Sequence, residues 1–110
     1  MKLPNIEKVI VPEAKITEYL LSFAHRDGCA KAVFFTGFGF TTQAWQTLAD
    51  ALISHAQENE VAKMEATSFG VRYVIEGILT APDGRSPNVR VVWFIATKDL
   101  VPYLVTAYPL

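Results

Sequence analysis

The second half of the chain alternates apolar and polar positions with a period of two. The alternation covers residues 71–79 and 89–95, and a shorter run follows at residues 103–109. The Pro-Asp-Gly sequence at residues 82–84 separates the first two runs and consists of residue types that favour a tight turn. The pattern predicts a β-hairpin followed by a third antiparallel strand. Residues 61–67 are compatible with a short edge strand, which would make a meander of three to four strands.

The first half of the chain follows the 3.6-residue period of amphipathic helices. An apolar stripe over two turns predicts a helix over residues 13–22, opened by Pro12. Its members are Ile16, Tyr19, Leu20 and Phe23. A longer stripe predicts a helix over residues 42–57, capped by Thr41 or Thr42. Its members are Trp45, Leu48, Ala49, Leu52, Ile53 and Ala56.

Residues 28–37 fit either a short helix or a strand. Asp27 is a suitable N-cap and Gly37 a suitable terminator for a helix, but Val33, Phe34 and Phe35 are also good strand residues. With either outcome, helices precede strands along the chain. We therefore predict one α+β domain over residues 1–110, with N-terminal helices packed on one face of a C-terminal antiparallel meander.

Composition agrees with a single folded domain. Of the 110 residues, 51% are hydrophobic, which is enough for one core, and 19% are charged, with no block of like charge. Cys29 is the only cysteine, no signal peptide is readable, and no apolar run approaches the roughly 20 residues that span a bilayer. We expect a soluble, cytoplasmic protein without membrane contact.

The net charge of −1 argues against a general nucleic-acid coat, because such proteins carry a basic excess. It still permits a small enzyme that gathers a few cations in one cleft. No metal or cofactor is expected. One cysteine and two separated histidines do not form a zinc site, and Gly37-Phe38-Gly39 lacks the third glycine of a dinucleotide-binding loop.

The alternation divides the strands into two faces. One is almost entirely apolar and includes Val71, Tyr73, Val91 and Trp93, so it should pack on the helices. The other mixes apolar residues such as Leu104 with polar ones: Arg72, Glu76, Arg90, Thr106 and Tyr108. This second face can be an ordinary solvated surface with ion pairs of little energetic value. It can also be an anion-binding surface that offers two guanidiniums and nearby hydroxyls.

Four further residues carry possible chemistry. His25 lies in a predicted loop and suits proton transfer at neutral pH, although an exposed loop histidine is as ordinary an interpretation. Lys31 would lie in the first turn of a helix, where anions bind, unless an Asp27 cap already occupies that position. Cys29 is expected to be a small buried thiol rather than a nucleophile, and His55 is expected to be exposed.

Several segments carry a family resemblance. They are the opening MKLPN, the stretch HRDGCAKAVFF, the run Gly70-Val71-Arg72-Tyr73, Trp93 and the ending LVTAYP. Together they resemble a small bacterial domain family of uncharacterised function, whose members occur alone or as the C-terminal tip of secreted polymorphic toxins. The helices-then-meander order and the closing Thr-x-Tyr are also similar to the barnase, EndoU, colicin D and RelE group of metal-independent ribonucleases.

The second resemblance implies a toxin-type endoribonuclease that cleaves RNA by attack of the 2′-OH. It implies that His25 and Lys31 act in proton transfer and charge stabilisation, that Arg72 holds the phosphate and that Thr106 or Tyr108 positions it. Arg90, Tyr108 and Tyr73 are the expected substrate-binding residues. On this hypothesis the protein needs no metal or cofactor, and its partners are RNA and a cognate antitoxin or immunity protein.

The alternative hypothesis is a non-enzymatic interaction module: an antitoxin, an immunity protein or an oligomerising accessory protein. The modest charge and the lack of a strong catalytic motif favour it. So do the aromatic residues Phe34, Phe38, Phe94 and Tyr108, as possible contact residues. The sequence leaves the oligomeric state open.

Overall fold

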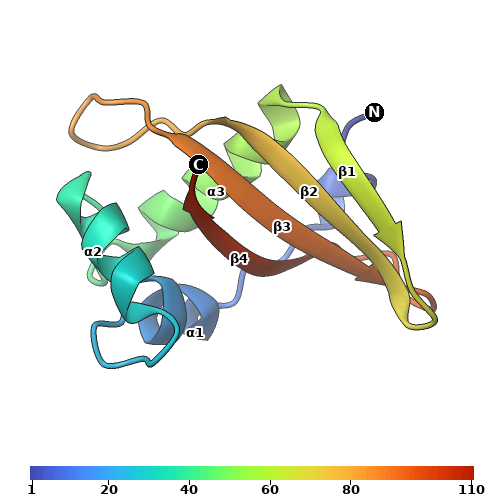
Figure 1. Cartoon of the computed structure of the whole chain (residues 1–110), viewed down its shortest axis with the longest axis horizontal. Helices are drawn as coiled ribbons and strands as arrows, with labels where there is room; N and C mark the ends of the chain where they lie inside the picture. The colour runs from blue at the N-terminus through green and yellow to red at the C-terminus, as the bar shows by residue number, and fades with distance from the viewer.

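The computed structural model describes all residues, 1–110, and its C-terminal half is a four-stranded antiparallel sheet. Its strands are β1 (Val61–Ala66), β2 (Gly70–Ile78), β3 (Asn88–Ala96) and β4 (Tyr103–Pro109), and they lie side by side in chain order (Figure 1). The long helix α3 (Trp45–Glu58) crosses behind this sheet. The predicted α+β class and meander are confirmed, with the edge strand as the fourth strand.

The remaining helical segments are short, and all but the first lie beside β4 (Figure 1). After the turn η1 (Ile6–Lys8), the helix α1 (Glu13–Lys15) continues into a π-helical turn, η2 (Ile16–Leu20). The predicted first helix is therefore present but ends early, because the chain turns once the N–H of Leu21 bonds to the carbonyl of Ile16. Ile16 and Leu20 are fully buried, whereas Phe23 has left the helix and is 62% exposed.

Residues 29–37 form a helix, α2 (Cys29–Gly37), which resolves the choice between helix and strand. The Asp27 side chain does not cap it. The His25 side chain closes the turn before the helix, because its Nδ1 accepts the backbone N–H groups of Asp27 and Gly28, each at 3.0 Å. Cys29 is exposed rather than buried, since it lies in the outward-facing first turn.

Helix α3 begins at Trp45, three residues later than predicted, because the hydroxyl of Thr41 accepts the N–H of Ala44 in a separate turn. Near the end of α3, the prediction that His55 is exposed is wrong. His55 is buried, with 1% of its surface exposed, because the last turns of α3 lie against β2. Its Nε2–H donates to the carbonyl oxygen of Gly77 at 3.2 Å.

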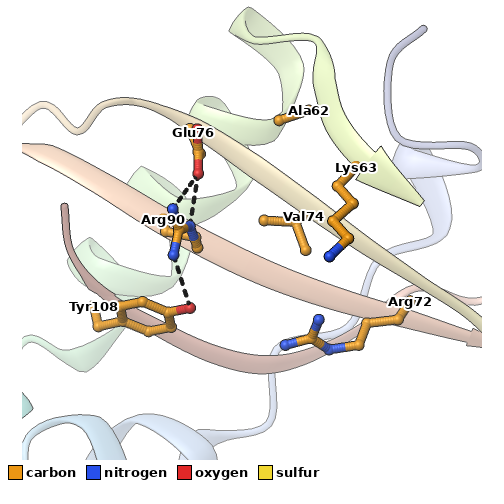
Figure 2. Close-up of a pocket in the computed structure, with 7 residues that line it drawn as sticks. All are labelled: Ala62, Lys63, Arg72, Val74, Glu76, Arg90 and Tyr108. Atoms are coloured by element: carbon orange, nitrogen blue, oxygen red, sulfur yellow. Dashed lines mark hydrogen bonds and ion pairs between the residues drawn. The ribbon is translucent and has the colours of Figure 1, made fainter. Parts of the chain in front are cut away.

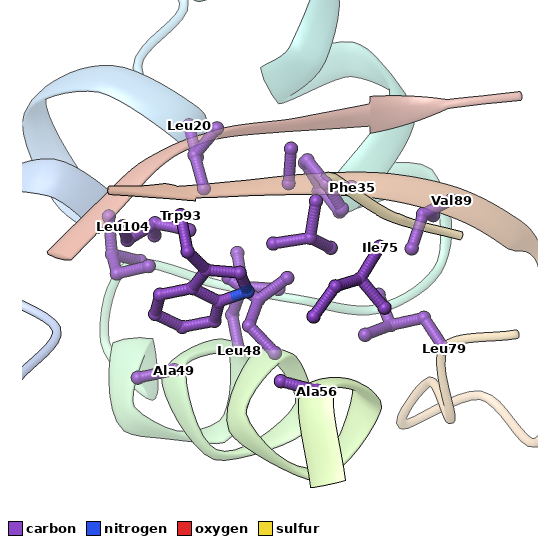
Figure 3. Packing of buried hydrophobic residues seen from close by; sticks show 14 of the residues in the cluster. Leu20, Phe35, Leu48, Ala49, Ala56, Ile75, Leu79, Val89, Trp93 and Leu104 are labelled. Atoms are coloured by element: carbon purple, nitrogen blue, oxygen red, sulfur yellow. The ribbon is translucent and has the colours of Figure 1, made fainter. Parts of the chain in front are cut away.

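The core fills the space between α3 and the sheet (Figure 3). Trp93 is its largest fully buried side chain, and Ile75 and Leu48 pack near it from β2 and α3. Full burial of one such side chain stabilises the fold by about 1.5–3 kcal/mol. The prediction that the Tyr73, Val91 and Trp93 face is the core is confirmed.

Leu104 is the exception to the predicted faces. The register shifts between β3 and β4, so that Thr106 faces Val92 but Leu104 faces Trp93. Val105 is the extra residue of this β-bulge, and it is 36% exposed. Leu104 consequently turns into the core, where 2% of its surface is exposed.

Candidate functional site

The polar residues predicted for one sheet face do gather there, on the face opposite α3, which we call the outer face. Strand register arranges them in cross-strand rows. Glu76, Arg90 and Tyr108 form one row across β2, β3 and β4, and Val74, Val92 and Thr106 form the next. A hollow of about 310 Å³ is lined by residues of all four strands (Figure 2). It is lined by Ala62, Lys63, Arg72, Val74, Glu76, Arg90 and Tyr108.

Arg90 is the best-anchored residue of this hollow. Its Nε and Nη2 both lie 2.6 Å from Oε2 of Glu76, and its Nη1 lies 3.5 Å from the Tyr108 hydroxyl (Figure 2). Its guanidinium also lies 5.6 Å from the centre of the Tyr108 ring. Tyr108 and Glu76 raise the pKa of Arg90, so its charge is permanent at physiological pH.

Arg72 is also paired. Its Nη1 donates to Oε1 of Glu65 at 2.7 Å, and Lys63 approaches the same oxygen at 3.8 Å. Each guanidinium on the outer face therefore has its own carboxylate. Beneath these charges the floor is apolar and well covered, because Val74 is 6% exposed and Val92 is fully buried. The hollow thus has an apolar floor and a rim on which each arginine is paired with a carboxylate, while Lys63 shares Glu65 with Arg72 and adds a further positive charge.

A second group of residues centres on Tyr19, beside β4. Its hydroxyl lies 2.9 Å from Oγ1 of Thr106. The His25 ring meets its ring edge-on, with 4.9 Å between centres. The ammonium groups of Lys15 and Lys31 lie 5.2 and 5.4 Å from the ring centre. Tyr19 thereby connects the predicted residues His25 and Lys31 to Thr106.

The hydrogen bonds of His25 fix its tautomer when it is neutral. Its Nδ1 accepts two backbone N–H groups, so the ring proton must sit on Nε2. The Lys31 ammonium donates to the carbonyl of Asp27 at 3.0 Å, which leaves two of its three protons for other acceptors. Both side chains can therefore donate to an anion bound beside Tyr19.

Arg72 stands apart from this group. Thr106 faces Val92, which in turn faces Val74, and Arg72 lies two residues further along β2. That offset of two strands and two residues separates the Cα atoms of Arg72 and Thr106 by about 12 Å. Arg90 lies only one strand away from Thr106. Of the two arginines, Arg90 is the one that can share a ligand with Thr106.

The residues of the chain place it in a family. Residues 2–110 match the model of a domain of unknown function, DUF6883. The chain belongs to this family. No curated protein matches the DUF6883 chain.

The same fold is found among solved structures. One of them is a chain of a contact-dependent growth inhibition toxin–immunity protein complex from Klebsiella pneumoniae 342. The two chains superpose with a TM-score of 0.72 at 18% sequence identity, over 94% of the DUF6883 chain and 95% of the other. At this identity the likeness establishes the fold of the DUF6883 domain and leaves its activity open.

The structure corrects one predicted site residue and adds another. Tyr73 was expected to bind substrate, but it lies on the core face, and only 7% of its surface is exposed. Tyr19 was assigned to the apolar stripe of the first helix, and it turns out to be the centre of a polar group. The early end of that helix is what brings His25 back against Tyr19, and no sequence signal marks that π turn.

No three side chains of His, Cys, Asp or Glu are grouped so that they could hold a metal ion. None of the helices has the length and apolar character needed to cross a bilayer.

Proposed function

We propose that this DUF6883 domain is one component of a bacterial toxin–immunity pair and that it binds its partner protein through the outer face of its sheet. The observation that carries the proposal is that both arginines of that face are already paired with carboxylates. Arg90 forms an ion pair with Glu76, and Arg72 forms one with Glu65. The positive charge of each guanidinium is thus balanced by a carboxylate and does not call for a phosphate. A hollow whose rim carries paired charges offers a partner protein a complementary shape and charge pattern rather than a single anion site.

The fold supports the same proposal. A domain of the same shape over almost its whole length occurs in a toxin–immunity protein complex. The sequence resemblance to tips of polymorphic toxins leads to the same class of system. Arginine and tyrosine are also the residue types that most often dominate binding energy at interfaces, and Arg90 and Tyr108 lie in contact on this face.

The first prediction concerns this interface. Arg90→Ala and Tyr108→Ala should each weaken binding of the protein encoded by the adjacent gene at least tenfold, because a hot-spot truncation costs about 2 kcal/mol or more. Isothermal titration calorimetry measures the change. Gln57→Ala is the matched control, because Gln57 is exposed on α3, behind the sheet. Equal affinity of all three variants would remove the outer face from the interface.

Growth assays then assign the role within the pair. Expression that arrests a bacterial host, with rescue by the adjacent protein, identifies the domain as the toxin. Harmless expression that protects the host against the adjacent protein identifies it as the immunity component. If the domain neither binds the adjacent protein nor affects growth, the proposal is wrong.

A second candidate function is the metal-independent ribonuclease of the sequence hypothesis. The Tyr19 group favours it, since His25 and Lys31 reach Thr106 through that side chain. In this mechanism the 2′-OH attacks the adjacent phosphorus and gives up its proton to water, and the bond between phosphorus and the 5′-oxygen breaks. His25 donates a proton to the leaving oxygen, and Lys31 with Arg90 stabilises the developing charge. The separate position of Arg72 and the pairing of both arginines count against this candidate.

The second prediction tests the ribonuclease. If this candidate is correct, the purified domain cleaves RNA in excess EDTA and leaves a 2′,3′-cyclic phosphate. His25→Ala should then reduce the cleavage rate by about 10²–10⁴-fold, which is the usual contribution of a general acid or base. Arg26→Ala is the control, because Arg26 is the exposed neighbour of His25 and lies outside the Tyr19 group. Cleavage that survives His25→Ala would rule out this mechanism.

A further inference from the structure

Strand β1 forms one edge of the sheet, with a neighbouring strand on one side only (Figure 1). At the β1–β2 turn the N–H of Thr67 bonds to the carbonyl of Gly70. Because hydrogen-bonded and non-bonded positions alternate along an antiparallel pair, Lys63 and Glu65 direct their backbone groups toward β2. Met64 and Ala66 therefore direct their N–H and C=O groups outward.

The chain itself shows that this edge accepts a neighbour. Before the β-bulge at Ala62, the N–H of Val61 points outward, and it donates to the carbonyl of Met1 at 2.7 Å. Beyond that point no backbone hydrogen bond from elsewhere in the chain reaches Met64 or Ala66. The Met64 side chain is 51% exposed, so an apolar residue lies at the centre of the open stretch.

The charges of β1 are complementary to a second copy of themselves. In an antiparallel pair centred on Met64, the outward groups of Met64 bond to those of Met64 in the other copy. Lys63 of each copy then lies opposite Glu65 of the other, and both side chains point to the outer face. Opposite charges in such cross-strand positions are favourable.

Other registers lose this match. A hydrogen-bonded pair must join two residues whose backbone groups point outward, so the nearest alternative joins Met64 of one copy to Ala66 of the other. That shift places Glu65 directly opposite Glu65, and like charges in such positions are unfavourable. Centring the pair on Ala66 leaves Glu65 opposite Thr67, with no charge partner. Only the register centred on Met64 has two favourable charge pairs.

We propose that two copies of this domain associate through β1 in that register, joining their sheets into one continuous eight-stranded sheet. The two Met64 side chains then cover one another on the side of the sheet that faces the helices. The pairing involves a single short strand from each copy, so it buries less area than a standard stable interface. The dimer should be weak and reversible, with a dissociation constant on the order of 10⁻⁵ M.

The third prediction tests the register by cross-linking. In a hydrogen-bonded antiparallel pair the two Met64 Cα atoms are about 5.5 Å apart, within the range that a disulfide spans. In a Cys29→Ser background, which removes the exposed native thiol, Met64→Cys should form a covalent dimer on mild oxidation. Lys63→Cys is the control, because its two copies would be about 8 Å apart and too far to bridge. Equal cross-linking of both variants would overturn the register.

Two variants of the parent chain, made without any cysteine substitution, test whether the backbone of β1 makes the pairing. Met64→Pro removes the outward N–H but no bond to β2, and proline is tolerated at such edge positions. Met64→Thr keeps the N–H and removes the same apolar side chain. Sedimentation velocity from about 1 µM to about 1 mM should show a dimer that grows with concentration in the parent and in Met64→Thr. It should show only monomer in Met64→Pro, with unchanged circular dichroism.

Two results would overturn self-association. One is a parent chain that stays monomeric throughout this range, and the other is a dimer that persists in Met64→Pro. If the parent is monomeric and Met64→Pro instead loses the protein partner of the proposed function, the edge belongs to that partner and not to a second copy.

Discussion

At the scale of single residues, Gly28 determines how closely the two sides of the Tyr19 group approach. A Cβ atom at Gly28 would lie 2.1 Å from the carbonyl oxygen of Tyr19 and 3.2 Å from its ring. The first contact is with backbone and cannot be relieved by rotating a side chain. Only glycine lets the start of α2 pack against the π turn, and this packing holds His25 beside the Tyr19 ring.

The fourth prediction follows from this contact. Gly28→Ala should lower the free energy of unfolding by about 1–3 kcal/mol, the usual cost of forcing an extra methyl group into a packed site. It should also shift the NMR signals of the His25 and Tyr19 rings. Urea unfolding followed by fluorescence measures the stability.

Gly37→Ala provides the comparison for Gly28→Ala. Gly37 is at the end of the same helix, and a Cβ there would meet nothing within 4 Å. Replacing a helical glycine without a clash should leave stability unchanged or raise it by up to about 1 kcal/mol. If the two variants lose stability equally, the close approach at Gly28 is not the cause.

At the scale of elements, periodicity identified the strands and the buried face of α3 but could not show where a period breaks. Alternation places Leu104 and Thr106 on the same face, yet the bulge at Val105 separates them. No glycine or proline marks that position. The bulge buries the larger side chain of Leu104 and leaves Val105 partly exposed. The bulge therefore depends on how Leu104 packs against Trp93 in the folded protein. The same limit applies to the π turn that ends the first helix.

The candidate site was predictable to a similar degree. Alternation alone gathered Arg72, Arg90, Thr106 and Tyr108 on one face, and the structure agrees. The pairing of each arginine was not predictable, because it depends on register. Glu76 lies directly across from Arg90, whereas the partner of Arg72 comes from β1, a strand whose sequence signal is weak.

At the scale of the whole molecule, one buried histidine couples the stability of the fold to pH. His55 is 1% exposed, and burial lowers its pKa. In the unfolded chain His55 is protonated near pH 6.5, the usual value, whereas in the folded chain it is protonated only at a lower pH. Stability is therefore full above about pH 6.5 and falls as the pH decreases through the interval down to the folded pKa.

The fifth prediction is the slope of this fall. Between about pH 6.5 and the folded pKa, the parent should lose up to about 1.4 kcal/mol of unfolding free energy per pH unit. His55→Gln should flatten the profile, because glutamine keeps an N–H donor for the Gly77 carbonyl but does not titrate. His25→Ala should keep the slope, since His55 remains.

The pKa values of the Glu60 and Asp83 carboxyls are lowered by the N-terminal ammonium and by Arg85, so both groups titrate below this window. Urea unfolding from pH 5.5 to 8 measures all three profiles, and a parent whose stability does not change over this range would contradict a neutral, buried His55.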